Sequence, residues 1–197
     1  MRVKKKKKVS IKKEDILLIV ENSEEIFFKE YFNNYLKEEY NILVKCESSG
    51  SGHKCKITDF DKMNKRIKRA IEKEGYSAVF LMIDLDTKCF ESNVNHTCLV
   101  QLKQEYLPKY KISKELKNKF YLFVVCNEIE SWFLTINKNT NNVNVDHKKE
   151  LMKFLNVKSE PQIIQKMVKE LKAKKYELDF SKNSSLQHFI KKLQEYR

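Results

Sequence analysis

The stretch that decides the fold is "DILLIVENSEEIFFKEYFNNYLKEEYNILVKC", residues 15–46. Its first six residues are an apolar run of the length and composition of a buried strand. Residues 23–40 follow with apolar side chains at spacings of three and four, which is one face of an amphipathic helix. Residues 41–46 are a second short apolar run. The order strand, helix, strand predicts a βαβ unit with parallel strands.

The same alternation continues along the chain. We predict four strands, separated by helices that include residues 57–75 and a segment near residues 97–107. These strands are 15–20, 41–46, 77–84 and 119–126. An Asn-rich connector follows at residues 135–147, and two or three amphipathic helices close the chain. We therefore expect an α/β fold with a Rossmann-like, mostly parallel sheet of about four strands covered by helices on both faces.

Charge is unevenly distributed over the 197 residues, whose net charge is +13. The first 13 residues hold eight of the 40 basic residues and no acidic one, so the remaining chain carries 32 basic and 27 acidic residues, a net of +5. We expect residues 1–13 to form a basic flexible tail. This tail is either a solubilising segment or an arm that binds nucleic-acid phosphates through lysines. The arm would use Lys4, Lys5, Lys6, Lys7 and Lys8.

Neither the apolar segments nor the cysteines point to a membrane or an oxidising compartment. The longest apolar run, residues 120–126, is far shorter than the roughly 18 residues of a transmembrane helix, and no signal peptide is evident. The five cysteines are an odd number without a CxxC pair. Two of the segments that contain them read C-x6-H-x-C, which suggests either a zinc site or buried thiols. We expect a cytoplasmic protein with no membrane association.

Acidic residues follow three of the four predicted strands. Glu21 ends the first strand, Asp84 and Asp86 end the third, and Glu128 and Glu130 follow the fourth. In parallel α/β folds, sites gather beyond the carboxyl ends of the strands. Each residue alone could be an ordinary acidic residue at the start of a helix. Together, the carboxylates would repel one another at neutral pH unless they shared a cation.

A hard divalent cation would remove that repulsion. Mg²⁺ prefers oxygen ligands, needs few carboxylates and keeps positions for water and for a substrate phosphate. We therefore predict Mg²⁺ or Mn²⁺ at this edge. Such an ion suits phosphodiester hydrolysis, in which it activates water and stabilises the leaving oxygen.

A glutamate at the end of the first strand, followed by D-x-D at the end of a later strand, resembles the Toprim domain. That domain occurs in topoisomerases, primases, ribosomal-RNA maturases and OLD-type nucleases. Its members usually have glycine after the glutamate, whereas this chain has Asn22. Asparagine tolerates a left-handed backbone, so a tight turn is still possible at this position.

A narrower resemblance covers most of the chain. It is to a Toprim-like family of unknown function, akin to RloB-type proteins and found near prokaryotic mobile-element and defence genes. Four matching segments stand in the expected order. They are "GHK" at 52–54, "DLDTKC" at 84–89, "CNEIESWFL" at 126–134 and "NSSLQHFIKKL" at 183–193. The chain departs from the pattern at 135–137, where "TIN" replaces a Gly-Asp pair, and the pattern accounts for only some of the cysteines.

The resemblance implies roles for individual residues. Glu21 would be the general acid/base or a metal ligand, Asp84 and Asp86 would be metal ligands, and Glu130 is favoured over Glu128 as the next carboxylate. Lys54 and Lys56 would contact phosphates. The domain would occupy residues 14–135, with residues 136–197 as a helical extension packed on it. Trp132 is expected to lie in the core, and His188 and the apolar stripe of the last helix are expected to have packing roles.

These observations leave more than one function open. The first hypothesis is a metal-dependent nuclease acting on DNA or RNA, with prokaryotic defence as its setting. The second is a non-catalytic nucleic-acid-binding or regulatory subunit with a degenerate site, which Asn22 and the missing Gly-Asp pair favour. A third is an effector that becomes active only with a defence-system protein partner.

Overall fold

The computed structural model describes residues 15–21, 24–49, 59–84, 104–125, 129–136 and 146–196, with the backbone only at Asp84, Glu160 and Pro161. Four parallel strands form one sheet in the order β2-β1-β3-β4. The strands are β1 (Ile16–Val20), β2 (Val44–Ser48), β3 (Ala78–Asp84) and β4 (Phe120–Val125). The predicted α/β fold with a mostly parallel sheet of about four strands is confirmed, and all the pairings of the described strands are parallel.

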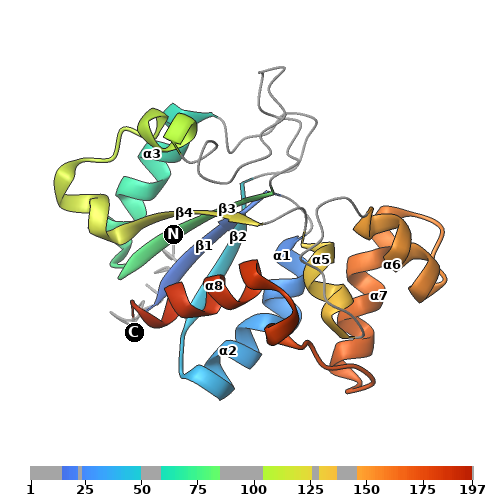
Figure 1. The fold of residues 1–197 in the computed structure, drawn as a ribbon. Coiled ribbons are helices and arrows are strands. Elements are labelled where there is room, and N and C mark those ends of the chain that lie inside the picture. Colours follow the sequence, from blue (N-terminus) through green and yellow to red (C-terminus); the bar gives the residue numbers. More distant parts are fainter. Residues whose placement is uncertain are drawn as a thin grey trace, which may run out of the picture.

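The helical segments cover both faces of this sheet (Figure 1). They are α1 (Glu24–Phe27), η1 (Phe28–Phe32), α2 (Asn33–Tyr40), α3 (Phe60–Arg69), η3 (Ala70–Glu74), η4 (Leu107–Lys109), η5 (Lys114–Lys119), α5 (Glu130–Phe133), η6 (Leu134–Ile136), α6 (His147–Leu155), α7 (Glu160–Lys172), η7 (Phe180–Lys182) and α8 (Ser184–Gln194). The three closing helices α6, α7 and α8 confirm the helical C-terminal part. The helix predicted near 97–107 is described only from residue 104, where a helical turn leads into η4.

The first predicted helix contains a π-helical turn, which the sequence did not predict. Residues 24–40 are continuous through α1, η1 and α2, and η1 is the π-helical part. A π-turn holds one more residue than an α-turn. This wider turn allows Phe27, Phe28 and Phe32 all to be fully buried on the same side of the helix. A second π-turn, η3, ends the α3 helix at Gly75, whose φ is +81°.

Strand β2 begins three residues later than its apolar run predicted. Asn41 adopts a left-handed conformation (φ 53°) and ends α2, and the Ile42 amide donates a 3.1 Å hydrogen bond to the Leu36 carbonyl oxygen. Residues 41 and 42 therefore cap the helix. Asparagine is one of the few residues other than glycine that adopt this conformation readily.

Alternate residues of each strand pack into two separate hydrophobic clusters. Ile16, Leu18 and Val20 of β1 face the cluster that includes α1, α2, α5 and the C-terminal helices. Leu17 and Ile19 face the cluster beneath α3 and η3, on the other side of the sheet. This burial on both faces explains the unbroken apolar strand sequences.

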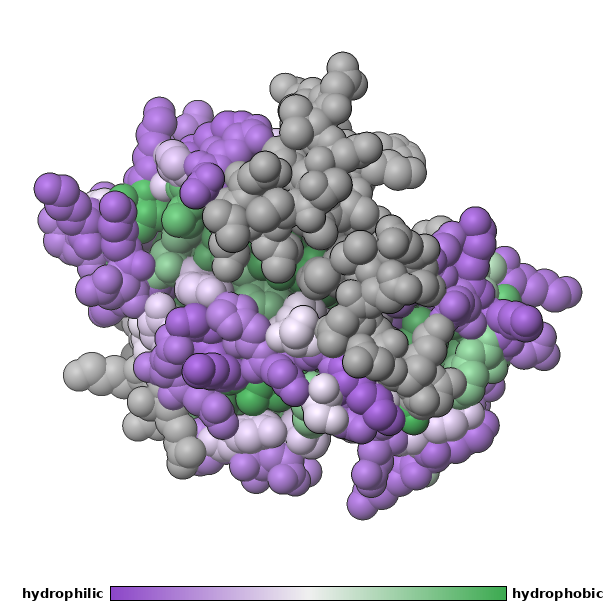
Figure 2. Space-filling model, in the orientation of Figure 1, coloured by the Kyte–Doolittle hydropathy of each residue, from purple (hydrophilic) through white to green (hydrophobic). Residues whose placement is uncertain are grey.

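The described part of the surface in Figure 2 is mostly hydrophilic, with smaller apolar areas. Among the described residues, the exposed large hydrophobic side chains are Leu107 and Phe154. No helix in those parts of the chain has both the length and the apolar character needed to cross a bilayer.

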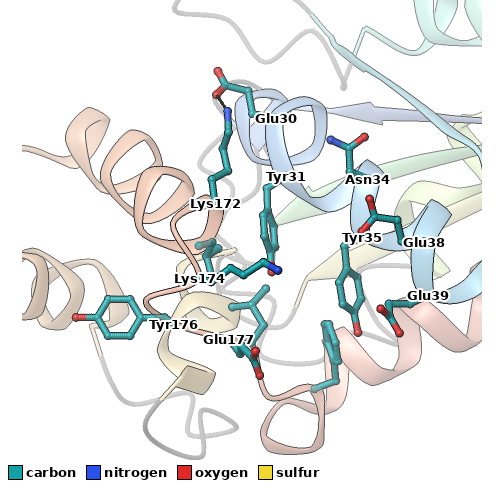
Figure 3. Close-up of a pocket in the computed structure, with 13 residues that line it drawn as sticks. Glu30, Tyr31, Asn34, Tyr35, Glu38, Glu39, Lys172, Lys174, Tyr176 and Glu177 are labelled. Carbon is teal, nitrogen blue, oxygen red and sulfur yellow. Dashed lines mark hydrogen bonds and ion pairs between the residues drawn. The ribbon is translucent and has the colours of Figure 1, made fainter.

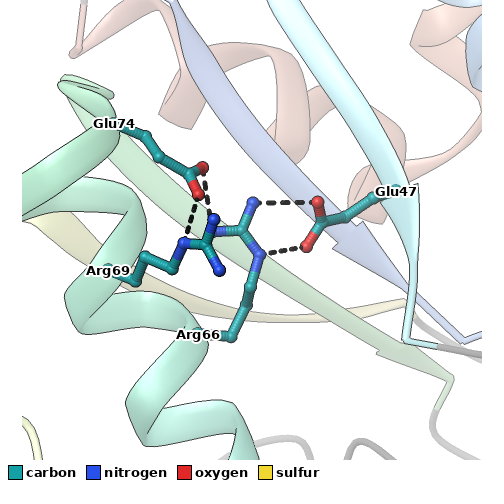
Figure 4. A network of polar contacts seen from close by, with 4 residues as sticks. All are labelled: Glu47, Arg66, Arg69 and Glu74. Atoms are coloured by element: carbon teal, nitrogen blue, oxygen red, sulfur yellow. Dashed lines mark hydrogen bonds and ion pairs between the residues drawn. The ribbon is translucent and has the colours of Figure 1, made fainter. Parts of the chain in front are cut away.

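Paired arginines and glutamates attach α3 and η3 to the edge strand β2 (Figure 4). Arg66 donates from Nε and Nη2 to the two carboxylate oxygens of Glu47, at 2.6 and 2.9 Å. Its Nη1 lies 3.0 Å from Glu74, which also pairs with Arg69 at 2.9 Å. The planar guanidinium can reach both carboxylates at once, which a lysine ammonium cannot do.

Arg66→Lys is expected to lower the free energy of unfolding by about 1–2 kcal/mol, because the bidentate contact is lost and the Arg66 side chain is largely shielded from solvent. Chemical denaturation would measure the change. Arg69→Lys is the matched control: Arg69 makes one contact and is 69% exposed, so its loss should cost under about 0.5 kcal/mol. Equal effects for the two variants would contradict this account of the Arg66 pair.

Candidate metal site at the carboxyl edge of the sheet

The strand order creates a topological switch point between β1 and β3. From β1, the chain passes to β2 on one side, and then returns across β1 to β3 on the other side. Ligands of open α/β sheets bind in the crevice beyond the strand ends at such a point. Glu21 directly follows β1 and Asp84 is the last residue of β3, so both lie at this position.

The strand register brings the two positions to the same level of the sheet. Ile19 of β1 pairs with Leu81 of β3. Continuing that register by two residues sets Glu21 opposite Ile83, the residue before Asp84. Adjacent strands lie about 4.8 Å apart, so the backbones of these two acidic residues are close together. On the other side, Asp84 pairs with Val125, the last residue of β4.

Glu130 lies beyond the end of β4, as the first residue of α5. It is only 6% exposed, which is unusual for a carboxylate. The neighbouring residues hold it in place. Ser131 Oγ accepts a 3.1 Å hydrogen bond from Asn183 Nδ2, and the Trp132 indole donates a 2.9 Å bond to Ser185 Oγ.

The backbone around Glu21 is fixed by the end of β2. The hydroxyls of Ser48 and Ser49 both donate to the Glu21 carbonyl oxygen, at 3.3 and 3.0 Å, and the Ser49 amide donates to the Val20 carbonyl at 2.8 Å. The segment that follows β2 therefore begins next to Glu21. Lys54 and Lys56 belong to that segment and lie outside the described residues.

Tyr110 is a neighbour of Glu21 that the sequence analysis missed. It is buried against Phe60 and Phe120, with ring centroids 5.0 and 5.7 Å away. Burial raises the pKa of the Tyr110 hydroxyl, and the negative charge of Glu21 raises it further. The phenol therefore stays neutral at physiological pH and keeps its proton to donate. The sequence gives no signal for this relation. Tyr110 stands some 90 residues after Glu21, and no periodic spacing connects the two positions.

The remaining predicted residues are not placed. Asp86, Glu128, Lys54, Lys56 and Lys4 to Lys8 lie outside the described residues, and of Asp84 only the backbone is described. Within the part of the chain that is described, no group of three or more His, Cys, Asp and Glu side chains could hold a metal ion. The described carboxylates of the predicted set are those of Glu21 and Glu130.

Of the cysteines, Cys46 lies in the described part of the chain. It is buried in the larger hydrophobic cluster, and this burial raises the pKa of its thiol. A protonated, buried thiol is a poor metal ligand. Cys46 therefore acts as a small hydrophobic residue here, which argues against a zinc site that would include it.

Two of the short motifs quoted above are in direct contact. The segment around Trp132 and the "NSS" turn at residues 183–185 are joined by the hydrogen bonds to Ser131 and Trp132 described above. Asn183 also caps α8, since its Oδ1 accepts from the Leu186 amide at 3.0 Å. Trp132 is completely buried, so its prediction as a core residue is confirmed. His188 is on the exposed side of α8, where its Nε2 lies 2.9 Å from the Tyr121 hydroxyl.

Residues 21–193 match the family described as "Domain of unknown function (DUF4276)". The chain belongs to this family. The DUF4276 match begins at Glu21 and ends at Leu193, so it spans the candidate site, strands β2 to β4 and nearly all of the C-terminal helices, whereas β1 lies before it. No curated protein and no solved structure matched the chain.

Proposed function

We propose that this DUF4276 protein is a divalent-metal-dependent nuclease of Toprim type, related to RloB-like proteins, that acts in the prokaryotic cytoplasm as part of defence. The observation that supports this proposal best is the strand order. It puts Glu21 and Asp84, which come from distant parts of the sequence, on neighbouring strand ends at the switch point of the sheet. We expect Asp86 of the "DLD" sequence and the buried Glu130 to extend the same acidic edge.

The chemistry of the donors fits Mg²⁺ or Mn²⁺. All the proposed ligands are carboxylates, which hard cations prefer, and the described residues near Glu21 offer no thiol. When bound, the cation would supply Lewis-acid activation of water and of the phosphodiester. Glu21, Asp84, Asp86, Glu128 and Glu130 would hold the cation.

The remaining proposed roles are those of side chains of the protein rather than of the cation. Glu21 would accept a proton from a water, and the two serine hydroxyls that donate to its carbonyl oxygen hold its backbone at the strand end. The Tyr110 hydroxyl, whose pKa is raised by burial and by the charge of Glu21, would keep a proton that it can donate. Lys54, Lys56 and the lysines of the tail would bind phosphates and add salt-dependent affinity.

A cleavage assay with the full-length protein tests the proposal. Labelled single-stranded DNA, duplex DNA and RNA would each be incubated with Mg²⁺, with Mn²⁺ and with EDTA. We expect cleavage of at least one substrate in the presence of either cation and none in EDTA. Measuring Mn²⁺ binding by electron paramagnetic resonance would report on the site independently of cleavage. Cleavage that continues in EDTA would contradict the proposal.

The second candidate is a non-catalytic nucleic-acid-binding or regulatory subunit, which acts with a defence-system protein. Two departures from the family pattern favour it: Asn22 stands in place of glycine, and "TIN" at residues 135–137 replaces Gly-Asp. This candidate predicts nucleic-acid binding that EDTA does not change, together with no cleavage of any substrate. The same assay, run with a binding measurement, therefore separates the two.

A further inference from the structure

A groove of about 630 Å³ lies between the first helix and the end of α7 with the segment that follows it (Figure 3). One wall is formed by residues of η1 and α2, and the other by residues 171–180. Acidic and aromatic side chains from both walls line it. The residues used below are Tyr31, Tyr35, Glu38, Glu39 and Glu177.

The groove is acidic, whereas the protein as a whole is strongly basic. Four glutamates and two lysines line it, and one of these lysines, Lys172, is paired with Glu30 at 3.3 Å. Among the described residues, Glu38, Glu39 and Glu177 form no ion pair. These three carboxylates outnumber the one remaining ammonium group, that of Lys174, and the excess negative charge favours a cationic occupant.

The tyrosines add a surface that suits ammonium groups. The rings of Tyr31 and Tyr35 are stacked, with centroids 6.5 Å apart and an interplanar angle of 16°. Burial raises the pKa of both hydroxyls, and Glu177 adds to the effect at Tyr31. Neutral tyrosine rings attract lysine ammonium groups through cation–π contacts. The rim already contains one such contact, with Lys175 Nζ 5.3 Å from the Tyr176 ring centroid.

The described chain begins near the end of α2, the helix that carries two glutamates of the groove. The Ile16 amide donates a 2.8 Å hydrogen bond to the Leu43 carbonyl oxygen, so the chain enters β1 beside the connection that leaves α2. Glu38 and Glu39 lie in the last turn of α2, four to five residues before Leu43. Residues 1–14, which lie outside the described residues, could span at most about 45–50 Å when extended. This length is ample for lysines near the N-terminus to reach the groove.

We propose that Lys4 to Lys8 of the same chain bind in the groove lined by Tyr31, Tyr35, Glu38, Glu39 and Glu177. The argument rests on the opposite charges of the tail and the groove, the aromatic walls and the reach of the tail. It does not depend on nuclease activity. Because each exposed ion pair is weak and screened by salt, the association is reversible and favoured at low ionic strength.

Carbodiimide cross-linking of the full-length protein tests this proposal. The reagent joins a lysine amine to a carboxylate that it contacts, and chymotryptic peptides analysed by mass spectrometry identify the joined residues. We expect Lys4–Lys8 to be joined to Glu38, Glu39 or Glu177 in the monomer band. The Lys172–Glu30 pair is an internal positive control. The yield should fall roughly tenfold between 0.1 and 1 M salt, since the Debye length shrinks from about 10 to about 3 Å.

A pair of matched variants makes the test specific. Glu38→Gln with Glu39→Gln removes two exposed charges from the groove and should lower the tail cross-links most. Glu72→Gln with Glu195→Gln removes two charges elsewhere and should leave the yield unchanged. Three results would overturn the proposal. They are equal loss in both variants, tail cross-links spread over surface glutamates in general, and tail cross-links confined to the dimer band, which would identify a second copy as the occupant.

Discussion

Asp84→Asn is expected to lower metal-dependent cleavage by about 10³-fold, which corresponds to roughly 4 kcal/mol of transition-state stabilisation. Asparagine keeps the size of the side chain but removes the negative charge that a hard cation requires. Asp84 is the last residue of β3, beside β1 and β4, so it has the most central position of the proposed ligands. Single-turnover cleavage rates with Mg²⁺ would measure the loss, and Mn²⁺ affinity should fall in parallel.

Two controls make this result interpretable. Glu72→Gln removes a partly exposed charge on η3, where its nearest ion-pair partner is Lys68 at 4.0 Å, and it should leave cleavage unchanged. The thermal midpoint of Asp84→Asn should match that of the unsubstituted protein, which would separate a lost ligand from a lost fold. If the variant retained most of the cleavage rate, Asp84 would have no role as a metal ligand.

Trp132→Ala is expected to lower the free energy of unfolding by about 3–5 kcal/mol, the largest stability effect of any substitution proposed here. The indole is completely buried between Phe28, Phe123 and Phe189, with ring centroids 5.5 to 6.4 Å away. Alanine would leave a cavity that these rings cannot fill. Because Trp132 is the single tryptophan, unfolding must be followed by circular dichroism rather than by fluorescence.

Smaller substitutions separate packing from hydrogen bonding at this position. Trp132→Phe keeps an aromatic ring but removes the Nε1 donor of the 2.9 Å bond to Ser185, and should cost about 1–3 kcal/mol. Combining it with Ser185→Ala gives a double-mutant cycle for that bond. Phe154→Ala is the exposed control and should cost under about 1 kcal/mol. A Trp132→Ala effect no larger than this control would show that the aromatic cluster does not support the core.

The Trp132 region shows how far sequence patterns reach. Its motif and the "NSSL" segment were each recognised separately, as short strings at the expected places along the chain. Their contact was not predicted, because Ser131 and Asn183 are 52 positions apart and no local period relates them. The structure shows that the serines and the asparagine of these motifs hold α5 against α8. Some residues of these motifs therefore have a structural role. They hold α5 in place, and α5 carries Glu130.

The candidate site was predictable in part, for a similar reason. An acidic residue after a strand is visible in the sequence at Glu21 and Asp84, and the rule for parallel sheets places both at one edge. That β1 and β3 are neighbours, however, follows from the strand order. The approach of Tyr110 to Glu21 depends on how the segment after η4 folds over the sheet.

The sequence by itself determined which segments form the four strands and the main helices, and that both sheet faces are buried, because each of these follows from the spacing of apolar residues over a few turns or a few strand positions. Its apolar strands alternating with helices were enough to specify a parallel α/β sheet. Only the tertiary structure decided that β1 lies between β2 and β3, that Trp132 bonds to Ser185, and that glutamates of α2 and of the segment after α7 line one groove. These features depend on contacts between residues far apart in the chain, and such contacts form only when the whole core packs.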